Sequence, residues 1–131
     1  MRASPVALFT AFSAVLLLAG CATAYHPANV GGGYREAQLE RNVFRVSFEG
    51  NLASTQEATN RMALLRSAEV ARDHGYPWFT ASAAATGTAG SIAFTTVRIP
   101  ASTITIVCYL ERPETRAIVY EADVLIATAG R

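Results

Sequence analysis

The chain has 131 residues, a hydrophobic share of 51% and a formal net charge of +1, which together indicate one small domain with enough apolar residues for a core. All 11 cationic residues are arginines, and 10 acidic residues spread along the chain balance them. Such a balance provides no concentrated positive field, so nucleic acid is not expected as a partner. The absence of lysine excludes Schiff-base chemistry.

The amino terminus has the pattern of a secretion signal. Arg2 supplies a positive start, and residues 6–18 form an uncharged apolar run that is short for a membrane span. The run ends on Leu18, Ala19, Gly20 and Cys21. This motif resembles a bacterial lipobox, in which the cysteine thiol is acylated and the bond between Gly20 and Cys21 is cleaved. We therefore predict a signal peptide over residues 1–20 and a lipid anchor on Cys21, with an uncleaved anchor as the alternative.

The residue after the lipidated cysteine indicates the destination. In enterobacteria-like sorting, an aspartate there retains lipoproteins in the inner membrane, and this chain has Ala22. We expect attachment to the outer membrane with the domain facing the periplasm, held firmly because two or three acyl chains bind far more stably than one.

A flexible tether is predicted over residues 21–33, which include Pro27 and three consecutive glycines. Residues 34–40 are polar and indicate a turn or an ordering arm. Residues 42–49 alternate, with Phe44, Val46 and Phe48 on one side, which predicts a half-buried strand.

One helix is predicted over residues 54–74, a stretch without glycine or proline. Ser54 and Glu57 have the spacing of a capping box. Gly75 is suited to a left-handed carboxy-terminal cap, and Pro77 prevents the helix from resuming.

The remaining chain predicts four further strands, at residues 78–83, 92–99, 103–110 and 117–127. Residues 84–91 are small and indicate a long connection or a mobile loop, and Pro100 separates two of the strands. Short connections favour antiparallel pairing. We predict an α+β fold over residues 34–131: five antiparallel strands with one helix on one face, in the order β-α-β-β-β-β.

Several blocks resemble a family of small proteobacterial lipoproteins of unknown function, with the pattern GYxxxxLxxNxFRVxFxGN, then LRxAE, then GYxxF. The matching residues are 33–51, 65–69 and 75–79. The resemblance implies location and architecture and no activity. The helix–glycine–aromatic segment is also similar to outer-membrane stress-sensor lipoproteins of the Rcs type, which rely on disulfides that this chain cannot form.

Residues with chemical potential are few. His26 and His74 have no further ligands at metal-binding spacing, so no metal or cofactor is expected. Cys108 shares a strand face with Ile104 and Ile106, and also with Leu110, which predicts a buried, inert thiol.

Glu36 and Glu40 are expected to be solvated charges, with an acid–base pair as the alternative.

One ion-pair cluster is predicted. Arg66 and Glu69 are spaced i, i+3 on the helix and could touch. If the helix covers the strand face that carries Arg45, Glu69 could join the two elements; the alternative is three independent surface charges.

Two functions remain open at this level. The first is a non-enzymatic envelope lipoprotein that acts as a structural or protein-interaction module. The second is a periplasmic ligand-binding or envelope-stress-sensing lipoprotein, with its site at Trp78, Phe79 and residues 84–91. An apolar pocket beside these aromatic residues would favour the second, and a filled sheet–helix interface with a bare outer sheet face would favour the first.

Overall fold

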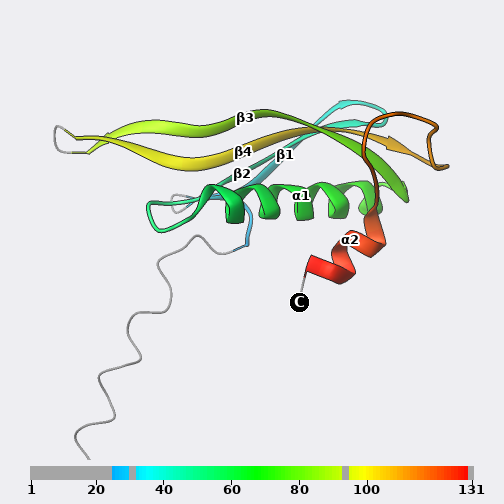
Figure 1. The fold of residues 1–131 in the computed structure, drawn as a ribbon, viewed down its shortest axis with the longest axis horizontal. Helices are drawn as coiled ribbons and strands as arrows, with labels where there is room; N and C mark the ends of the chain where they lie inside the picture. The colour runs from blue at the N-terminus through cyan, green and yellow to red at the C-terminus, as the bar shows by residue number, and fades with distance from the viewer. Residues whose placement is uncertain (1–24, 30–31, 93–94, 130–131) are drawn as a thin grey trace, which may run out of the picture.

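The computed structural model describes residues 25–29, 32–92 and 95–129, which form a five-stranded antiparallel sheet with two helices on one face (Figure 1). The strand order is β1-β2-β4-β3-β5. The elements are β1 (Gly33–Glu40), β2 (Val43–Glu49), α1 (Gln56–Asp73), β3 (Trp78–Ile92), β4 (Thr95–Tyr109), β5 (Val119–Glu121) and α2 (Ala122–Ala129). The predicted α+β class and the antiparallel five-stranded sheet are confirmed.

The predicted order of elements is wrong, because two strands precede α1 and a second helix ends the described chain. Residues 34–40, expected to be a turn or an arm, belong to β1, which pairs along β2. The composition of β1 is polar and six of its eight residues are exposed, so no alternation of polar and apolar residues marks it in the sequence. Pairing with β2 determines its conformation instead of local propensity.

The hairpin of β3 and β4 corrects two further predictions. Residues 84–91, expected to be a loop, continue β3, and the expected strands at 92–99 and 103–110 are one strand. Pro100 is tolerated because it lies where the β3–β4 ladder changes register between Thr86 and Thr88, and its carbonyl accepts a 2.8 Å hydrogen bond from the Gly50 amide.

The predicted strand at 117–127 is confirmed only at residues 119–121. Of these residues only 119–121, strand β5, pair with β3, and α2 follows directly. A short apolar stretch suits a strand and a buried helix equally by pattern. The tertiary structure selects the helix, because Ala122 is buried, its amide binds the Pro77 carbonyl at 3.0 Å, and Leu125 and Ile126 pack against the core.

Helix α1 is determined mainly by local signals. Its cap is Thr55, whose hydroxyl accepts from the Ala58 amide at 3.1 Å, and not the predicted Ser54. At the other end Gly75 has φ +83°, and the amides of Gly75 and Tyr76 bind the carbonyls of Arg72 and Ala71. This is the Schellman arrangement that the sequence predicts at Gly75.

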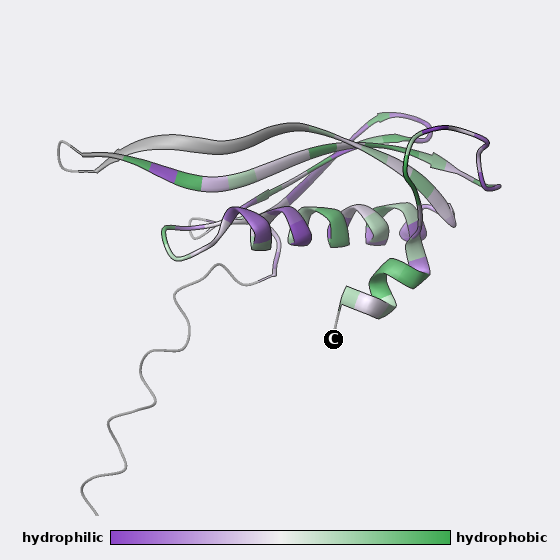
Figure 2. Ribbon diagram, in the orientation of Figure 1, coloured by the Kyte–Doolittle hydropathy of each residue, from purple (hydrophilic) through white to green (hydrophobic). Residues whose placement is uncertain are grey.

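The core lies between α1 and the sheet. It is built from Phe44, Val46 and Phe48 of β2, together with side chains of α1, β3 and β4. The alternation predicted for residues 42–49 is therefore confirmed. Figure 2 shows β1 as largely hydrophilic and α2 as largely hydrophobic. Neither described helix is long and apolar enough to cross a membrane.

Residues 25–29 and 32–33 correct the prediction of a flexible tether over 21–33. The amide of Tyr34 binds the His26 carbonyl at 2.9 Å, and the amide of Ala28 binds the Tyr34 carbonyl at 2.9 Å. Gly33 is buried with φ +118°, and a Cβ there would lie 2.5 Å from the His26 carbonyl oxygen. Glycine is thus required where the N-terminal segment, residues 25–29, turns back against β1.

Candidate functional site

The central polar group of the candidate site is Arg66, on the flank of α1 that faces β1. Its Nε and Nη2 donate to the two carboxylate oxygens of Glu36 at 2.7 and 3.0 Å, and its Nη1 donates to Glu69 at 3.0 Å. The arginine side chain is only 16% exposed, and that of Glu69 is 19% exposed. One guanidinium therefore joins β1 to α1 through a bidentate pair and a helical pair.

The register of β1 explains why Glu36 reaches this place. Glu36 lies opposite Val46 and Tyr34 opposite Phe48, so both share the strand face that looks toward α1. Arg45 lies opposite Ala37, on the other face, and is exposed.

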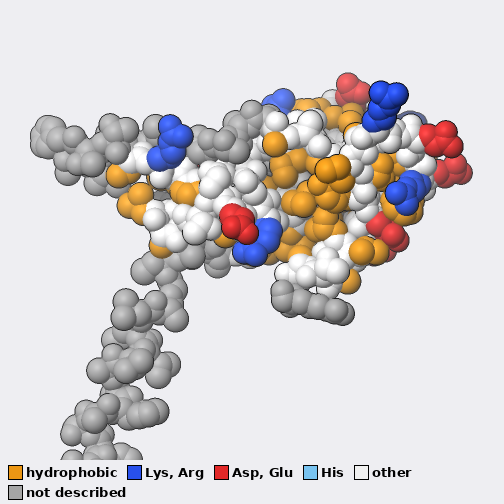
Figure 3. All heavy atoms as spheres, viewed as in Figure 1, with side chains coloured by type: hydrophobic (Ala, Val, Ile, Leu, Met, Phe, Trp, Pro, Cys, Tyr) orange, Lys and Arg blue, Asp and Glu red, His pale blue; other side chains and the backbone are white. Residues whose placement is uncertain are grey.

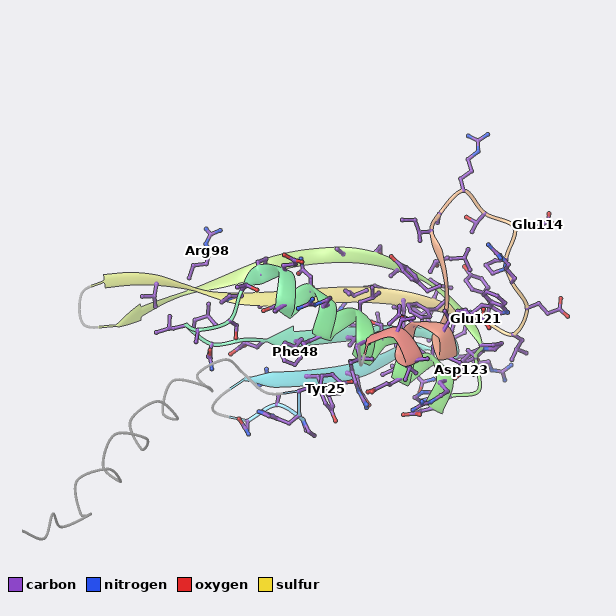
Figure 4. All side chains as sticks on the ribbon, turned by 60° about the horizontal axis from the view of Figure 1, so that its bottom comes forward. Tyr25, Phe48, Arg98, Glu114, Glu121 and Asp123 are labelled. Carbon is purple, nitrogen blue, oxygen red and sulfur yellow. The ribbon has the colours of Figure 1, made fainter. Side chains whose placement is uncertain are left out.

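The N-terminal segment is attached to this cluster through Tyr25. The phenol donates a short hydrogen bond to Glu69, and the ring packs 5.1 Å from Tyr34 and 6.4 Å from Phe48, measured between centroids. Arg66 lies 4.3 Å above the Tyr34 ring. Figure 4 shows Tyr25 beside the strands of the β1–β2 hairpin, with Phe48 next to it. Aromatic stacking and paired charges thus hold residues that follow Cys21 by only a few positions.

The electrostatics of the cluster favour a charged guanidinium at Arg66 and a neutral phenol at Tyr25. Hydrogen bonds to Glu36 raise the pKa of Arg66 above its usual value, against the opposing effect of burial. Burial, and then the hydrogen bond to Glu69, raise the pKa of the Tyr25 phenol above its usual range. The guanidinium is therefore charged and the phenol neutral at physiological pH. In these states Arg66 donates to Glu36 and Glu69, and Tyr25 donates to Glu69.

The predicted ion pair is thus assembled in part. Arg66 and Glu69 are together, and Arg45 is apart, because α1 covers the opposite face of β2. Sequence reasoning missed Glu36 and Tyr25 as members of the cluster. Glu36 is held by Arg66 and is therefore not the independent solvated charge that the sequence predicts. A strand prediction for residues 34–40 would have placed Tyr34 and Glu36 on one face and pointed to them.

Trp78 and Phe79 are placed differently from the predicted ligand region. Phe79 is fully buried and stacks 5.2 Å from Tyr120, and Trp78 packs under Arg112 at 5.4 Å. The loop expected beside them is strand β3. A groove of about 530 Å³ lies elsewhere, between α1 and α2.

The other candidate residues have simple positions. Gly20 and Cys21 lie outside the described residues. His74 caps α1, with Nδ1 2.8 Å from the Val70 carbonyl and its ring 4.4 Å from that of Phe44. Cys108 is buried as predicted, and burial raises the pKa of its thiol to about 12. Within residues 25–29, 32–92 and 95–129, no group of His, Cys, Asp and Glu side chains is gathered so as to hold a metal.

The chain matches no protein-family model, no curated protein and no solved structure. The resemblance of residues 33–79 to a lipoprotein family therefore stays a prediction.

Proposed function

We propose that this chain is a non-enzymatic lipoprotein of the cell envelope, anchored through Cys21 in the outer membrane, with its domain acting as a structural or protein-interaction module in the periplasm. The observation that carries the proposal is the fixed N-terminal segment beside the lipobox. Tyr25 follows Cys21 by four residues, so an extended chain would span about 14 Å between them. A lipidated protein of this design would be held close to the bilayer in a restricted orientation.

The arrangement of the sheet supports an interaction module. Both helices lie on one face (Figure 1), and the opposite face presents outward side chains of the strands, among them Arg45, Ser47 and Thr105. A sheet face that neither described helix covers offers a broad surface to a partner protein.

The anchor is tested by labelling cells with radioactive palmitate. The wild-type chain should incorporate label, and Cys21→Ser should not and should appear in the soluble periplasmic fraction. An Ala22→Asp variant should keep the label and move to the inner-membrane fraction. Label in Cys21→Ser would contradict lipidation at this residue, and an unchanged location of Ala22→Asp would contradict only the sorting inference.

The interaction module is tested by photocrosslinking in cells. A photoreactive phenylalanine analogue at Arg45, on the outer sheet face, should trap a discrete envelope protein. The matched position is Asn60, which is exposed on α1 on the other side of the molecule. Equal crosslinking at both positions, or none at Arg45, would speak against the sheet face as the partner surface.

The second candidate function, a ligand-binding or sensing lipoprotein, is favoured by a separate observation, the groove between α1 and α2.

A further inference from the structure

The groove between α1 and α2 combines an apolar lining with one cation. Its walls are formed by Met62, Leu64 and Leu65 of α1 and by Leu125 and the last turn of α2, with Arg61 beside them. Figure 3 shows hydrophobic side chains gathered over these two helices in the middle of the face. A volume of about 530 Å³ is within the range of about 300–1,000 Å³ that is usual for small-molecule sites.

Arg61 differs from the other two arginines of α1. Arg66 is held by two carboxylates, and Arg72 lies 3.4 Å from Asp73. For Arg61 the described residues provide no ion pair, although it lines the groove. Among the other lining residues, Thr128 already donates its hydroxyl to the helix carbonyls of Val124 and Leu125, both at 3.0 Å. The Arg61 guanidinium is therefore a hydrogen-bond donor in the groove that no described carboxylate pairs with.

We propose that this groove binds a single-chain amphiphile with a carboxylate head, such as a fatty acid. The acyl chain would lie between Leu65 and Leu125, where it removes apolar surface from water. The carboxylate would accept two parallel hydrogen bonds from Arg61, the geometry for which a planar guanidinium is suited. This site is separate from the Arg66 cluster and does not depend on whether Cys21 carries lipid.

Binding is measured by the fluorescence of dansyl-undecanoic acid, with its methyl ester as the uncharged probe. The protein is the full chain with Cys21→Ser, purified without detergent, so that no attached lipid competes. We expect saturable enhancement and a blue shift with the acid, displaced by palmitate. Arg61→Gln should weaken binding of the acid about tenfold and leave binding of the ester unchanged. The matched control Arg72→Gln, on the same helix outside the groove, should change neither.

The lining is tested with Leu125→Asp, which should abolish binding of both probes. Because Leu125→Asp also changes the packing of α2, its thermal unfolding is measured alongside. If Leu125→Asp is unfolded, the result for Arg61→Gln alone decides whether the groove binds the acid. The proposal is overturned if the wild-type chain shows no saturable binding, or if Arg61→Gln and Arg72→Gln behave alike. It is also overturned if soluble dihexanoyl-phosphatidylglycerol displaces the probe as well as palmitate, since the site would then recognise a phosphodiester lipid.

Discussion

The two flanks of α1 are covered by segments from opposite ends of the chain, and they are held by different forces. On the β1 side, the N-terminal segment is fixed by Arg66, two carboxylates and stacked aromatic rings. On the other side, α2 packs through Leu125 and Ile126 and leaves a groove. The first flank has its charges paired and its rings in contact, whereas the second retains an open apolar surface and Arg61, which forms no ion pair among the described residues. The proposed attachment and the proposed ligand site thus lie on opposite flanks of one helix.

The largest expected effect is on the charged flank. Arg66→Gln leaves Glu36 and Glu69 partly buried without their cation and removes the contact with Tyr34. We expect the free energy of unfolding, measured in urea, to fall by about 2–3 kcal/mol.

The control is Arg72→Gln, whose pair with Asp73 is about half-exposed and should contribute less than about 0.5 kcal/mol. The free energy of unfolding of Glu69→Gln tests the same cluster a second time. A loss below about 0.5 kcal/mol there would mean that the cluster behaves as ordinary surface charges.

The turn that brings the N-terminal segment back is the next place to break this flank. Gly33→Ala introduces a Cβ at φ +118° against the His26 carbonyl, and we expect a loss of about 2 kcal/mol. Amide hydrogen exchange in residues 25–29 should accelerate more than in α1. Gly75→Ala is the matched comparison, because its φ is also positive but open space surrounds it, and about 1 kcal/mol is expected. Equal costs at the two glycines would indicate that residues 25–29 contribute little.

The apolar flank should respond independently. Leu125 is half-buried, so Leu125→Ala is expected to cost about 1–2 kcal/mol, less than for a fully buried leucine. Exchange in residues 25–29 should stay unchanged, because Tyr25 is bound on the β1 side of α1 and Leu125 lies on the α2 side. Val124, which is 53% exposed on the same helix, supplies the control: Val124→Ala should cost less than about 0.5 kcal/mol. Faster exchange in residues 25–29 of Leu125→Ala would mean that the flanks are coupled.

The smallest effect concerns the Tyr25 hydroxyl. Tyr25→Phe keeps the stacking and loses the hydrogen bond to Glu69, for an expected loss of about 1 kcal/mol at neutral pH. The folded-state pKa of this phenol is raised, so its contribution is present below the usual phenol pKa of about 10 and is lost as the pH rises above it. Unfolding measured from pH 8 to 11 should therefore show a shallower alkaline decline in Tyr25→Phe than in the wild-type chain. Parallel curves would show that Tyr25 does not titrate differently in the folded state.

The sequence by itself determined the elements whose signals lie within a few residues of one another. The alternation of Phe44, Val46 and Phe48, and the end of α1 at Gly75, depend on side-chain period and backbone conformation, which are local properties. The class of the fold follows from these elements and from their short connections.

Only the tertiary structure decided which distant segments meet. Glu36 and Tyr25 are 30 and 44 residues from their partners on α1, so no local spacing reports these contacts. In the same way, Pro100 stays within β4 because of the register shift opposite it, and residues 122–129 become a helix because α1 offers an apolar surface to pack on. In each case the deciding energy comes from contacts made after the chain has folded, and these outweigh local preferences that are close to neutral.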